Sequence, residues 1–389
     1  MLSNSLPGLD FCLGSDIEML RDTVRDFAQE KIAPRAAEID RTAEYPWDIR
    51  RMLAEHDVLA LPFEPEYGGT GTLMQQMAVE EIATVCASSA LILMLQELGS
   101  LPISLFGSPE LKAQWLPRFA SGELAPAFAL SEPEAGSDPA AMRTTAVRDG
   151  DEWILNGEKN WISNATIADA YVVFAKTDRE GGRSSAFLVE ADRPGFSIGS
   201  VEHKLGIKGS PTGSPVLEDV RVPAANLIGT EGKGLSIALA TLERTRLGAA
   251  AQAVGIAQGA TDYANAYAKE RIAFGKPINQ LQAIQFKLAD METGTAAARE
   301  LLYKACAMVD RGVPGVGKYT SMAKVFASDN AMRVTVDGVQ VLGGYGYVND
   351  YPLERMMRDA KITQIYEGTN QIQRVVIARQ ILKRLAAAS

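Results

Sequence analysis

Strand-like sequence is confined to one central block of the chain, and this restricts the fold more than any other feature. Short β-rich runs occur at residues 125–130, 153–155, 171–175 and 186–189. Pairs typical of hairpin turns separate them, namely Asp149-Gly150, Asn156-Gly157 and Gly181-Gly182. The block closes with residues 216–220 and a turn at Pro223. We therefore expect a small β-barrel or sandwich domain in the middle of the chain.

Helical periodicity lies on both sides of this block. We expect helices from about residue 15, at about 73–105 and at 109–119, and again at about 235–270, 280–311, 317–342 and 370–385. Because helices and strands do not alternate, the order disfavours a Rossmann fold. The predicted fold class is α+β, mostly α. Its parts are an N-terminal helical domain (1–123), the β domain (124–234) and a C-terminal four-helix bundle (235–389).

The composition is that of an ordinary globular enzyme, with 47% hydrophobic and 22% charged residues in a chain of 389. The net charge of −9 argues against a nucleic-acid partner. Two histidines in all argue against a metal site, and the separated cysteines Cys12, Cys86 and Cys306 suit buried apolar positions. We find no targeting peptide and no apolar run of about 18 residues. A soluble, cytoplasmic protein without a membrane partner is expected.

One carboxylate near the C-terminus stands in an apolar setting. Glu367 lies in the sequence QIYEGTNQ of residues 364–371, with Gly368 directly after it. Burial raises the pKa of a carboxyl group toward neutral pH, which suits a general base. The same residue could instead cap the helix expected at 370–385. This segment alone leaves both interpretations open.

Two glycine-rich segments are interpreted as turns. Residues 229–234, with the sequence GTEGKG, lack the spacing of phosphate-binding loops and lie at a domain junction. Gly343 and Gly344 follow a predicted helix, which is typical of a C-terminal cap. The backbone amides of that cap could also approach a ligand.

Two segments of the β block together suggest a surface for a flat aromatic ligand. They are residues 131–138, with the sequence SEPEAGSD, and residues 160–164, with the sequence NWISN. Trp161 offers a ring face, and Ser131, Ser137 and Ser163 offer hydroxyl groups beside loop amides.

With these segments in view, the sequence resembles the acyl-CoA dehydrogenases, a family of FAD-dependent flavoproteins. The resemblance covers nearly the whole chain. It rests on ordered matches at residues 20–27, 66–69, 131–138, 161–164, 204–210, 218–223, 271–275, 340–346, 358–361 and 366–369. The order of helices, β domain and helical bundle is also that of the family.

The resemblance implies a role for each matching residue. Glu367 would remove the α-proton of an acyl thioester, and its backbone amide, with a ribityl hydroxyl of the flavin, would hold the thioester carbonyl. The β-hydrogen would leave as hydride to the flavin, with Ser163 near flavin N5. The implied substrate contacts are Ser137, Glu243, Arg246, Tyr366 and Gly368.

The resemblance also implies which residues bind FAD. The β domain would contribute Phe128, Leu130, Ser131, Gly136, Ser137, Trp161 and Ser163, and the C-terminal part Thr369 and Gln371. A neighbouring subunit would hold the adenosine end through Arg271, Phe274, Gln282, Gln340, Gly343 and Gly344. Because such a site is shared, we expect a homotetramer built as a dimer of dimers. Electron-transferring flavoprotein is the implied electron acceptor.

Some members of the family carry the base on the helix near Thr245. Glu243 is two residues away, about 200° around a helix of 3.6 residues per turn, so we assign the base to Glu367. Departures from the family pattern are few. Glu134 adds a charge to the predicted flavin loop unless it faces solvent, and Phe128 replaces a frequent tyrosine.

The acyl specificity stays open on sequence grounds. The C-terminal half resembles the group specific for short straight chains, and branched short chains remain an alternative because pocket depth depends on a few side chains in residues 85–100. Discrimination by one methylene is worth only about 1–3 kcal/mol. An acyl-CoA oxidase, a dehydrogenase acting on an acyl carrier protein and a non-catalytic flavoprotein are the remaining alternatives. A glutaryl-CoA dehydrogenase is disfavoured because residues 86–95 contain no arginine.

Overall fold

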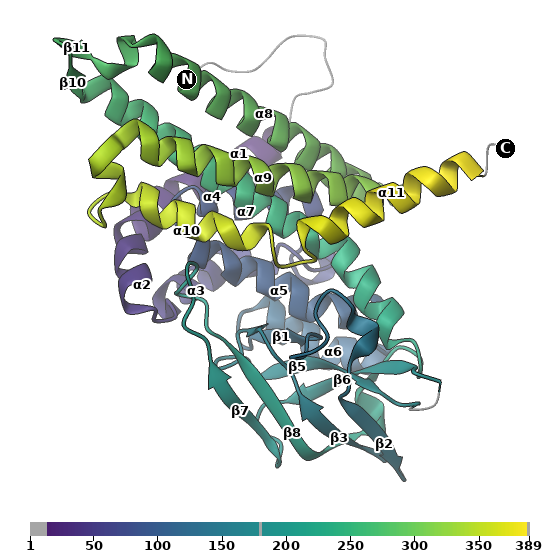
Figure 1. The fold of residues 1–389 in the computed structure, drawn as a ribbon. Coiled ribbons are helices and arrows are strands. Elements are labelled where there is room, and N and C mark those ends of the chain that lie inside the picture. The colour runs from purple at the N-terminus through teal and green to yellow at the C-terminus, as the bar shows by residue number, and fades with distance from the viewer. Residues whose placement is uncertain (1–13, 179–180, 387–389) are drawn as a thin grey trace.

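The computed structural model describes residues 14–178 and 181–386. Helices of the N-terminal part lie beside a long helical array, and a β domain lies below both in Figure 1. The predicted α+β fold class, mostly α, is therefore confirmed. The N-terminal helices are α1 (Ser15–Phe27), α2 (Ala36–Thr42), α3 (Trp47–Glu55), α4 (Thr72–Ala83), α5 (Ala87–Phe106) and α6 (Pro109–Ala120).

The helix predicted at about 73–105 is two helices. The chain turns at Cys86, whose extended backbone (φ −151°, ψ 102°) precedes the first residue of α5. By length and composition α5 could cross a membrane, which the sequence analysis missed, but 78% of its most apolar window is buried inside the protein. Cys86 and Cys306 are free and buried, as expected, whereas Cys12 lies outside the described residues.

The β domain is one nine-stranded sheet folded on itself. Its path runs β4-β8-β3-β2-β5-β6-β9, with β1 beside β5 and β7 beside β8. The strands are β1 (Pro126–Ala129), β2 (Thr145–Asp149), β3 (Glu152–Glu158), β4 (Ile162–Ser163), β5 (Ala170–Lys176), β6 (Ser184–Glu190), β7 (Phe196–Val201), β8 (Thr212–Pro223) and β9 (Leu227–Ile228).

Strand β5 is buried on both faces because its alternate side chains point into two different cores. Ala170, Val172 and Phe174 pack with helical residues such as Trp115. Tyr171, Val173 and Ala175 pack inside the folded sheet. The strand therefore attaches the sheet to the helices.

The hairpin predicted at Asn156-Gly157 was wrong. Both residues lie within β3, where the pairing with β8 shifts register between Leu155 and Gly157. A Cβ on Gly157 would lie 2.7 Å from the Thr144 Cα, so glycine allows a close approach of backbone here. The signal marked a β-bulge and not a turn.

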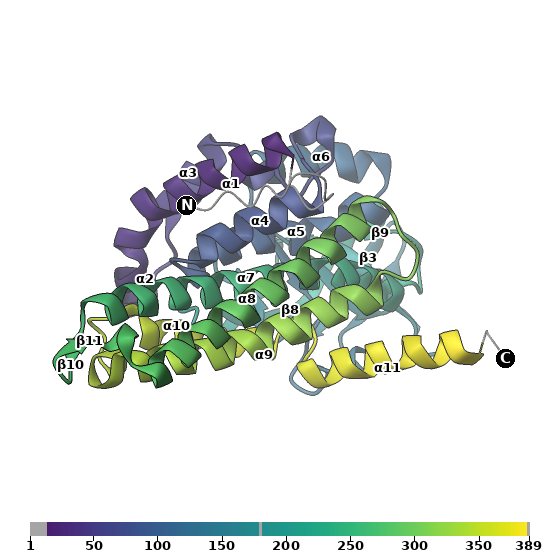
Figure 2. The ribbon, with the colours of Figure 1, turned by 90° about the horizontal axis from the view of Figure 1, so that it is seen from above.

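The C-terminal part is built on α7 (Gly234–Glu270), whose 37 residues span about 55 Å. It packs with α8 (Gln282–Asp310) and α9 (Gly317–Leu342), and the short hairpin of β10 (Ile272–Ala273) and β11 (Lys276–Pro277) follows its last turn. The sequence analysis missed α10 (Pro352–Thr363), which packs against α7 and α9. Helix α11 (Asn370–Ala386) packs against α9 and then extends away from the other helices (Figure 2).

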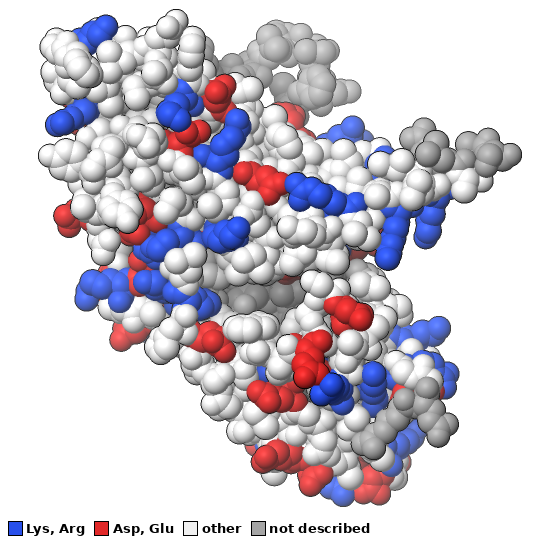
Figure 3. All heavy atoms as spheres, viewed as in Figure 1, with Lys and Arg blue, Asp and Glu red and all other residues white. Residues whose placement is uncertain are grey.

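Charges of both signs are interspersed on the face drawn in Figure 3, with wide uncharged areas between them. Basic side chains gather along α11 on this face.

Glycines on α7 set its distance from α4. A Cβ on Gly259 would lie 2.0 Å from the Thr84 carbonyl oxygen, and one on Gly255 would lie 2.2 Å from the Glu80 carbonyl oxygen. We expect Gly259→Ala to force the helices apart and to lower stability by about 1–3 kcal/mol. Thermal unfolding measures this, with Gly14→Ala, which meets no atom within 4 Å, as control. Equal midpoints for the two variants would contradict the close packing.

Candidate functional site

The turn between α10 and α11 holds Glu367 in a left-handed backbone conformation. Its φ is +56°, and the φ of Gly368 is +85°. Such a conformation is uncommon for a residue with a side chain, and it persists only where the surroundings enforce it. The N-terminus of α11 is capped by Thr369, whose Oγ1 accepts a bond from the Ile372 N–H (3.3 Å). Glu367 is thus not the cap that its sequence position allowed.

The Glu367 carboxylate points toward α7. Its Oε2 accepts a hydrogen bond from the Thr245 hydroxyl at 3.0 Å. Burial raises the pKa of Glu367 to about 7, against the opposing effects of the Thr245 bond and the Arg246 charge. The resemblance gave the Thr245 position as an alternative place for the base, and in this chain the two positions meet at one hydrogen bond.

Side chains from α7, α9 and α11 fix the turn from behind. Lys324 Nζ and Gln373 Nε2 each donate to the Gly368 carbonyl at 2.8 Å, and Gln373 also donates to the Glu367 carbonyl at 3.0 Å. Arg246 NH1 donates to Gln373 Oε1 at 2.9 Å and to Ser321 Oγ at 2.6 Å. The sequence analysis missed Lys324 and Gln373, since neither stands in a motif that predicts chemistry.

This support leaves one backbone group of the turn unpaired. Among the described residues, the Glu367 N–H has no acceptor. Tyr366 directs its hydroxyl to Gln252 Oε1 on α7. Glu243 lies against the first turn of α9, where a Cβ on Gly317 would meet its Oε1 at 2.1 Å. The structure therefore brings Tyr366, Glu367 and Gly368 together and leaves Glu243 at the side.

On the β domain, the two predicted ligand segments are joined through Asn160. Its N–H donates to the Ser131 carbonyl at 2.9 Å, and its Oδ1 accepts from the Trp161 N–H at 2.9 Å. Trp161 has a left-handed backbone (φ +63°), and 59% of its surface is exposed. The exposed tryptophan ring offers a flat face that suits a flavin.

A buried ion pair supports the two ligand segments, residues 131–138 and 160–164, which together are called the flavin cradle. Lys159 Nζ lies 2.7 Å from Glu132 Oε1 and donates to the Leu130 carbonyl at 3.2 Å. Burial lowers the pKa of Lys159 to about 8, while Lys159 keeps the pKa of Glu132 below its usual value despite burial. Sequence reasoning missed the pair, although Glu132 lies within the first ligand segment and Lys159 directly precedes the second.

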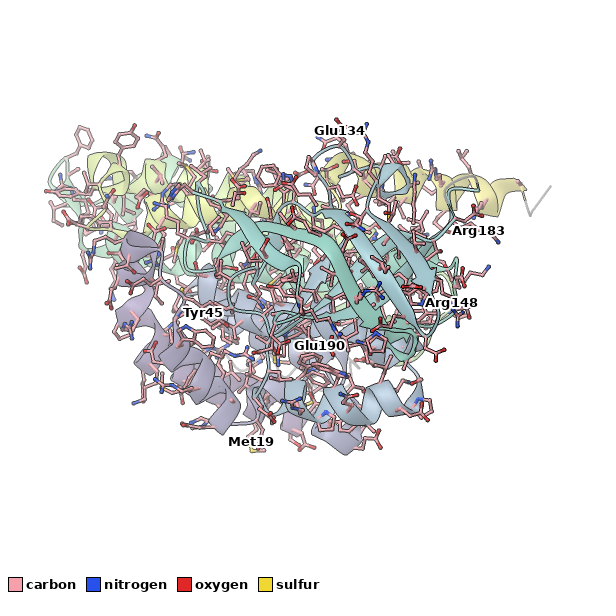
Figure 4. All side chains as sticks on the ribbon, turned by 90° about the horizontal axis from the view of Figure 1, so that it is seen from below. Met19, Tyr45, Glu134, Arg148, Arg183 and Glu190 are labelled. Carbon is pink, nitrogen blue, oxygen red and sulfur yellow. The ribbon has the colours of Figure 1, made fainter. Side chains whose placement is uncertain are left out.

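The other predicted flavin residues of the β domain lie around this pair. Phe128 packs on Phe174 with ring centroids 4.9 Å apart. Leu130 is buried, Ser131 and Ser163 are half-buried, and Gly136 and Ser137 are exposed. Glu134 points outward at the edge of the molecule in Figure 4 and pairs with Arg143. Its charge therefore faces solvent.

The residues expected to serve a neighbouring subunit lie at the far end of the bundle. Arg271, Phe274, Gly343 and Gly344 line a hollow of about 860 Å³ that also contains Tyr345. The Arg271 guanidinium lies 5.6 Å from the Tyr345 ring centre, and Phe274 is 89% exposed. Gln282 and Gln340 are exposed and do not line this hollow.

The residues around Arg271 and Gly343 are too far from the Glu367 turn for both sets to form one site within one chain. Lys324 on α9 contacts the Glu367 turn, whereas Gly343 directly follows the end of α9. The two residues are 19 positions apart, which is about 28 Å along the helix axis. Thr369 and Gln371 lie beside the turn, with Gln371 exposed. Within residues 14–178 and 181–386, no three His, Cys, Asp or Glu side chains gather to hold a metal.

Comparison with known proteins identifies three consecutive family domains. The N-terminal, middle and C-terminal domains of acyl-CoA dehydrogenase match residues 14–123, 127–220 and 232–382. An acyl-CoA dehydrogenase of Bacillus subtilis is 46% identical over 94% of this chain and 97% of its own. A cyclohexane-1-carbonyl-CoA dehydrogenase of Geobacter metallireducens is also 46% identical, over 97% and 100%. A short-chain specific acyl-CoA dehydrogenase of Clostridium acetobutylicum is 45% identical, over 96% and 100%.

Solved structures agree with these relatives. Butyryl-CoA dehydrogenase from Megasphaera elsdenii superimposes with a TM-score of 0.94 at 42% identity, covering 96% of this chain and 100% of that one. A chain from work on the electron transferring flavoprotein of Acidaminococcus fermentans gives 0.94 at 45%, with the same coverage. A Bacillus anthracis acyl-CoA dehydrogenase complexed with FAD gives 0.91 at 34%, covering 97% and 68%. The chain belongs to the acyl-CoA dehydrogenase family of FAD-dependent oxidoreductases.

Proposed function

We propose that the protein oxidises short-chain acyl-CoA thioesters to trans-2-enoyl-CoA, with Glu367 as the base. The observation that carries this proposal is the half-buried Glu367, whose carboxyl group has a pKa of about 7 and accepts a hydrogen bond from Thr245. Its own backbone N–H is unpaired among the described residues. A base poised near the working pH is effective because it is ionised at rest and still accepts a proton.

Each group near Glu367 has a distinct task in this reaction. The Glu367 carboxylate takes the α-proton, and its N–H donates to the thioester carbonyl, where negative charge develops. Loss of one such donor costs about 10²–10³ in rate in other enzymes. When bound, FAD would supply the acceptor for the hydride that leaves the β-carbon. Trp161 and the loop at residues 131–138 would hold its ring system, with Ser163 near the reacting nitrogen.

A polar contact beyond Glu367 supports a short acyl group. Tyr366 donates to Gln252, and Gln252 Nε2 donates to the Ala87 carbonyl on α5 at 2.9 Å. Gln252 lies seven residues after Thr245 on α7, about 10.5 Å along the helix. A long acyl chain would have to disrupt these bonds and leave their groups unpaired. The short-chain and butyryl-CoA relatives agree with this inference.

The relatives and the hollow around Arg271 also support proposals for the electron acceptor and the oligomeric state. We infer that electron-transferring flavoprotein reoxidises the flavin, since a structural relative comes from work on such a protein. A homotetramer is supported by the hollow around Arg271, which lies far from Glu367 and would serve the FAD of a neighbouring subunit. A cytoplasmic location remains the expectation from sequence.

Anaerobic titration with acyl-CoA thioesters tests the proposed function. We expect butyryl- and hexanoyl-CoA to bleach the flavin, with isobutyryl- and isovaleryl-CoA inert. If only branched or cyclic thioesters bleached the flavin, the assignment of a short straight-chain substrate would be wrong. A cyclic substrate would match the name of the Geobacter relative. No bleaching of a fully flavinated protein by any of them would contradict the catalytic proposal, and rapid oxygen uptake after reduction would indicate an oxidase.

Glu367→Gln provides the matched control for this titration. It preserves the size of the side chain and removes the base, so FAD should stay bound while bleaching is abolished. Near-normal bleaching by this variant would contradict the assignment of Glu367.

The pH dependence of flavin reduction follows from the raised pKa of Glu367. Only the ionised carboxylate removes a proton, and its fraction falls below a pKa of about 7. We expect the second-order rate constant for reduction to drop about tenfold per pH unit below that pKa and to level off above it. Stopped-flow measurements at low substrate concentration check this. A flat profile down to pH 5 would mean that the base is not a carboxyl group with a raised pKa.

Removal of the polar contact should change chain-length preference. Gln252→Ala deletes the hydrogen-bond partner of Tyr366. We therefore expect kcat/KM for hexanoyl- and octanoyl-CoA to rise relative to kcat/KM for butyryl-CoA. Relative kcat/KM values across the series measure the effect, which we expect to be about 10-fold or more. An unchanged order of substrates in a variant that still binds FAD would show that another wall limits the chain.

A further inference from the structure

A buried ammonium group lies directly behind the Glu367 turn. Lys324 on α9 has no exposed surface, and its Nζ donates to the Gly368 carbonyl and to Asn370 Oδ1, each at 2.8 Å. Gly368 belongs to the turn that carries Glu367, and Asn370 is the first residue of α11 directly after it. Lys324 makes no direct ion pair with a carboxylate in the part of the chain that the structure describes.

Burial of the Lys324 ammonium group costs free energy that the contacts of Lys324 must offset. Removing an ammonium group from water carries a penalty of several kcal/mol, and two neutral oxygens compensate only in part. Burial lowers the pKa of Lys324 to about 7, and the charge of Glu367 is the leading effect that opposes this shift. The lysine and the carboxylate therefore stabilise each other's charge through the turn.

We propose that Lys324 is a positioning residue for the base, which holds the Glu367 turn in its left-handed conformation and offsets the charge of the ionised carboxylate. The proposal rests on the proposed function, in which Glu367 must be ionised before substrate arrives. It adds a role that no motif in the sequence indicated.

Asn370 extends the grip of α9 over the turn. Its Nδ2 donates to Asp329 Oδ1 at 2.8 Å, and the Gln364 side chain donates to the same oxygen at 2.7 Å. Residues on both sides of Glu367 are thus bound to α9. Lys324 binds between them, at Gly368.

Several other charged groups face the pair. On α7, Arg246 favours ionised Glu367 and disfavours charged Lys324, and Glu243 acts on Arg246. On α5, Glu97 opposes ionisation of Glu367, and on α9, Asp329 favours charged Lys324. Tyr366 stays neutral because burial and Glu367 raise its pKa. Glu367 and Lys324 each have a pKa of about 7, and the charge of each favours the charged form of the other.

The sign of the expected change follows from this coupling. Opposite charges close together favour the charged form of each, so loss of the Lys324 charge should raise the pKa of Glu367. The acid limb of the rate profile would then move to higher pH. The backbone of the turn would also lose a hydrogen bond at Gly368.

The test compares flavinated Lys324→Met and Lys324→Gln with wild type and with Lys318→Met, a control on the same helix. Single-turnover flavin reduction is followed from pH 5.5 to 9, and hydrogen exchange is followed at residues 364–370. We expect the acid limb to shift to higher pH in both Lys324 variants and not in Lys318→Met. Exchange should rise severalfold in Lys324→Met and less in Lys324→Gln, whose amide can still donate to the turn.

The outcomes separate this proposal from the proposed function. If wild type is not bleached by any acyl-CoA, the proposed function fails, while the exchange measurement still tests the grip on the turn. If wild type is bleached and both Lys324 variants keep its pH profile and its exchange rates, the role of Lys324 is overturned. If Lys324→Met does not bind FAD, Lys324→Gln and Lys324→Arg take its place; Lys324→Arg should keep the wild-type acid limb, and a shift like that of Lys324→Gln would contradict charge compensation.

Discussion

Burial of α7 on all sides is the constraint on which the rest of the molecule depends. Its middle, from Thr245 to Ala257, is buried without interruption and contacts α4, α5, α8, α9 and α10. Small residues such as Gly255 and Gly259 allow this close contact. Because Thr245, Arg246 and Gln252 lie on the same helix, the packing that stabilises the core also places three side chains around Glu367.

The candidate site is an assembly of charges that the fold removes from water. Glu367, Arg246 and Lys324 come from three different helices or turns. Burial raises the pKa of Glu367 and lowers the pKa of Arg246 and of Lys324, which favours the neutral form of each. None of them has a simple one-to-one ion pair with another. Hydrogen bonds hold them instead: Thr245 donates to Glu367, Arg246 donates to Ser321 and Gln373, and Lys324 donates to Asn370. In the β domain, Glu132 and Lys159 form a direct buried pair in support of the flavin cradle.

Sequence reasoning succeeded where local pattern and tertiary environment agree. The β block, its hairpin at Asp149-Gly150 and the C-terminal cap at Gly343 follow from turn chemistry and periodicity. It failed where glycine had another use, as at the bulge beside Gly157. It also missed α10, a 12-residue helix that begins at Pro352 after a glycine-rich segment and that packs between elements distant in sequence.

The sequence by itself determined the order of the three parts, the family and the choice of Glu367 over Thr245 as the candidate base, because these depend on local periodicity and on residue type at matched positions. Only the tertiary structure decided that Glu367 is not a helix cap and that Thr245 donates to it. It also decided that Lys324 and Gln373 grip its turn and that the residues around Arg271 lie far from it. The Thr245 and Lys324 contacts join residues 122 and 44 positions apart, and the Gln373 contacts depend on how the turn folds back on its own helix. The first two contacts are not encoded in any short segment of the chain.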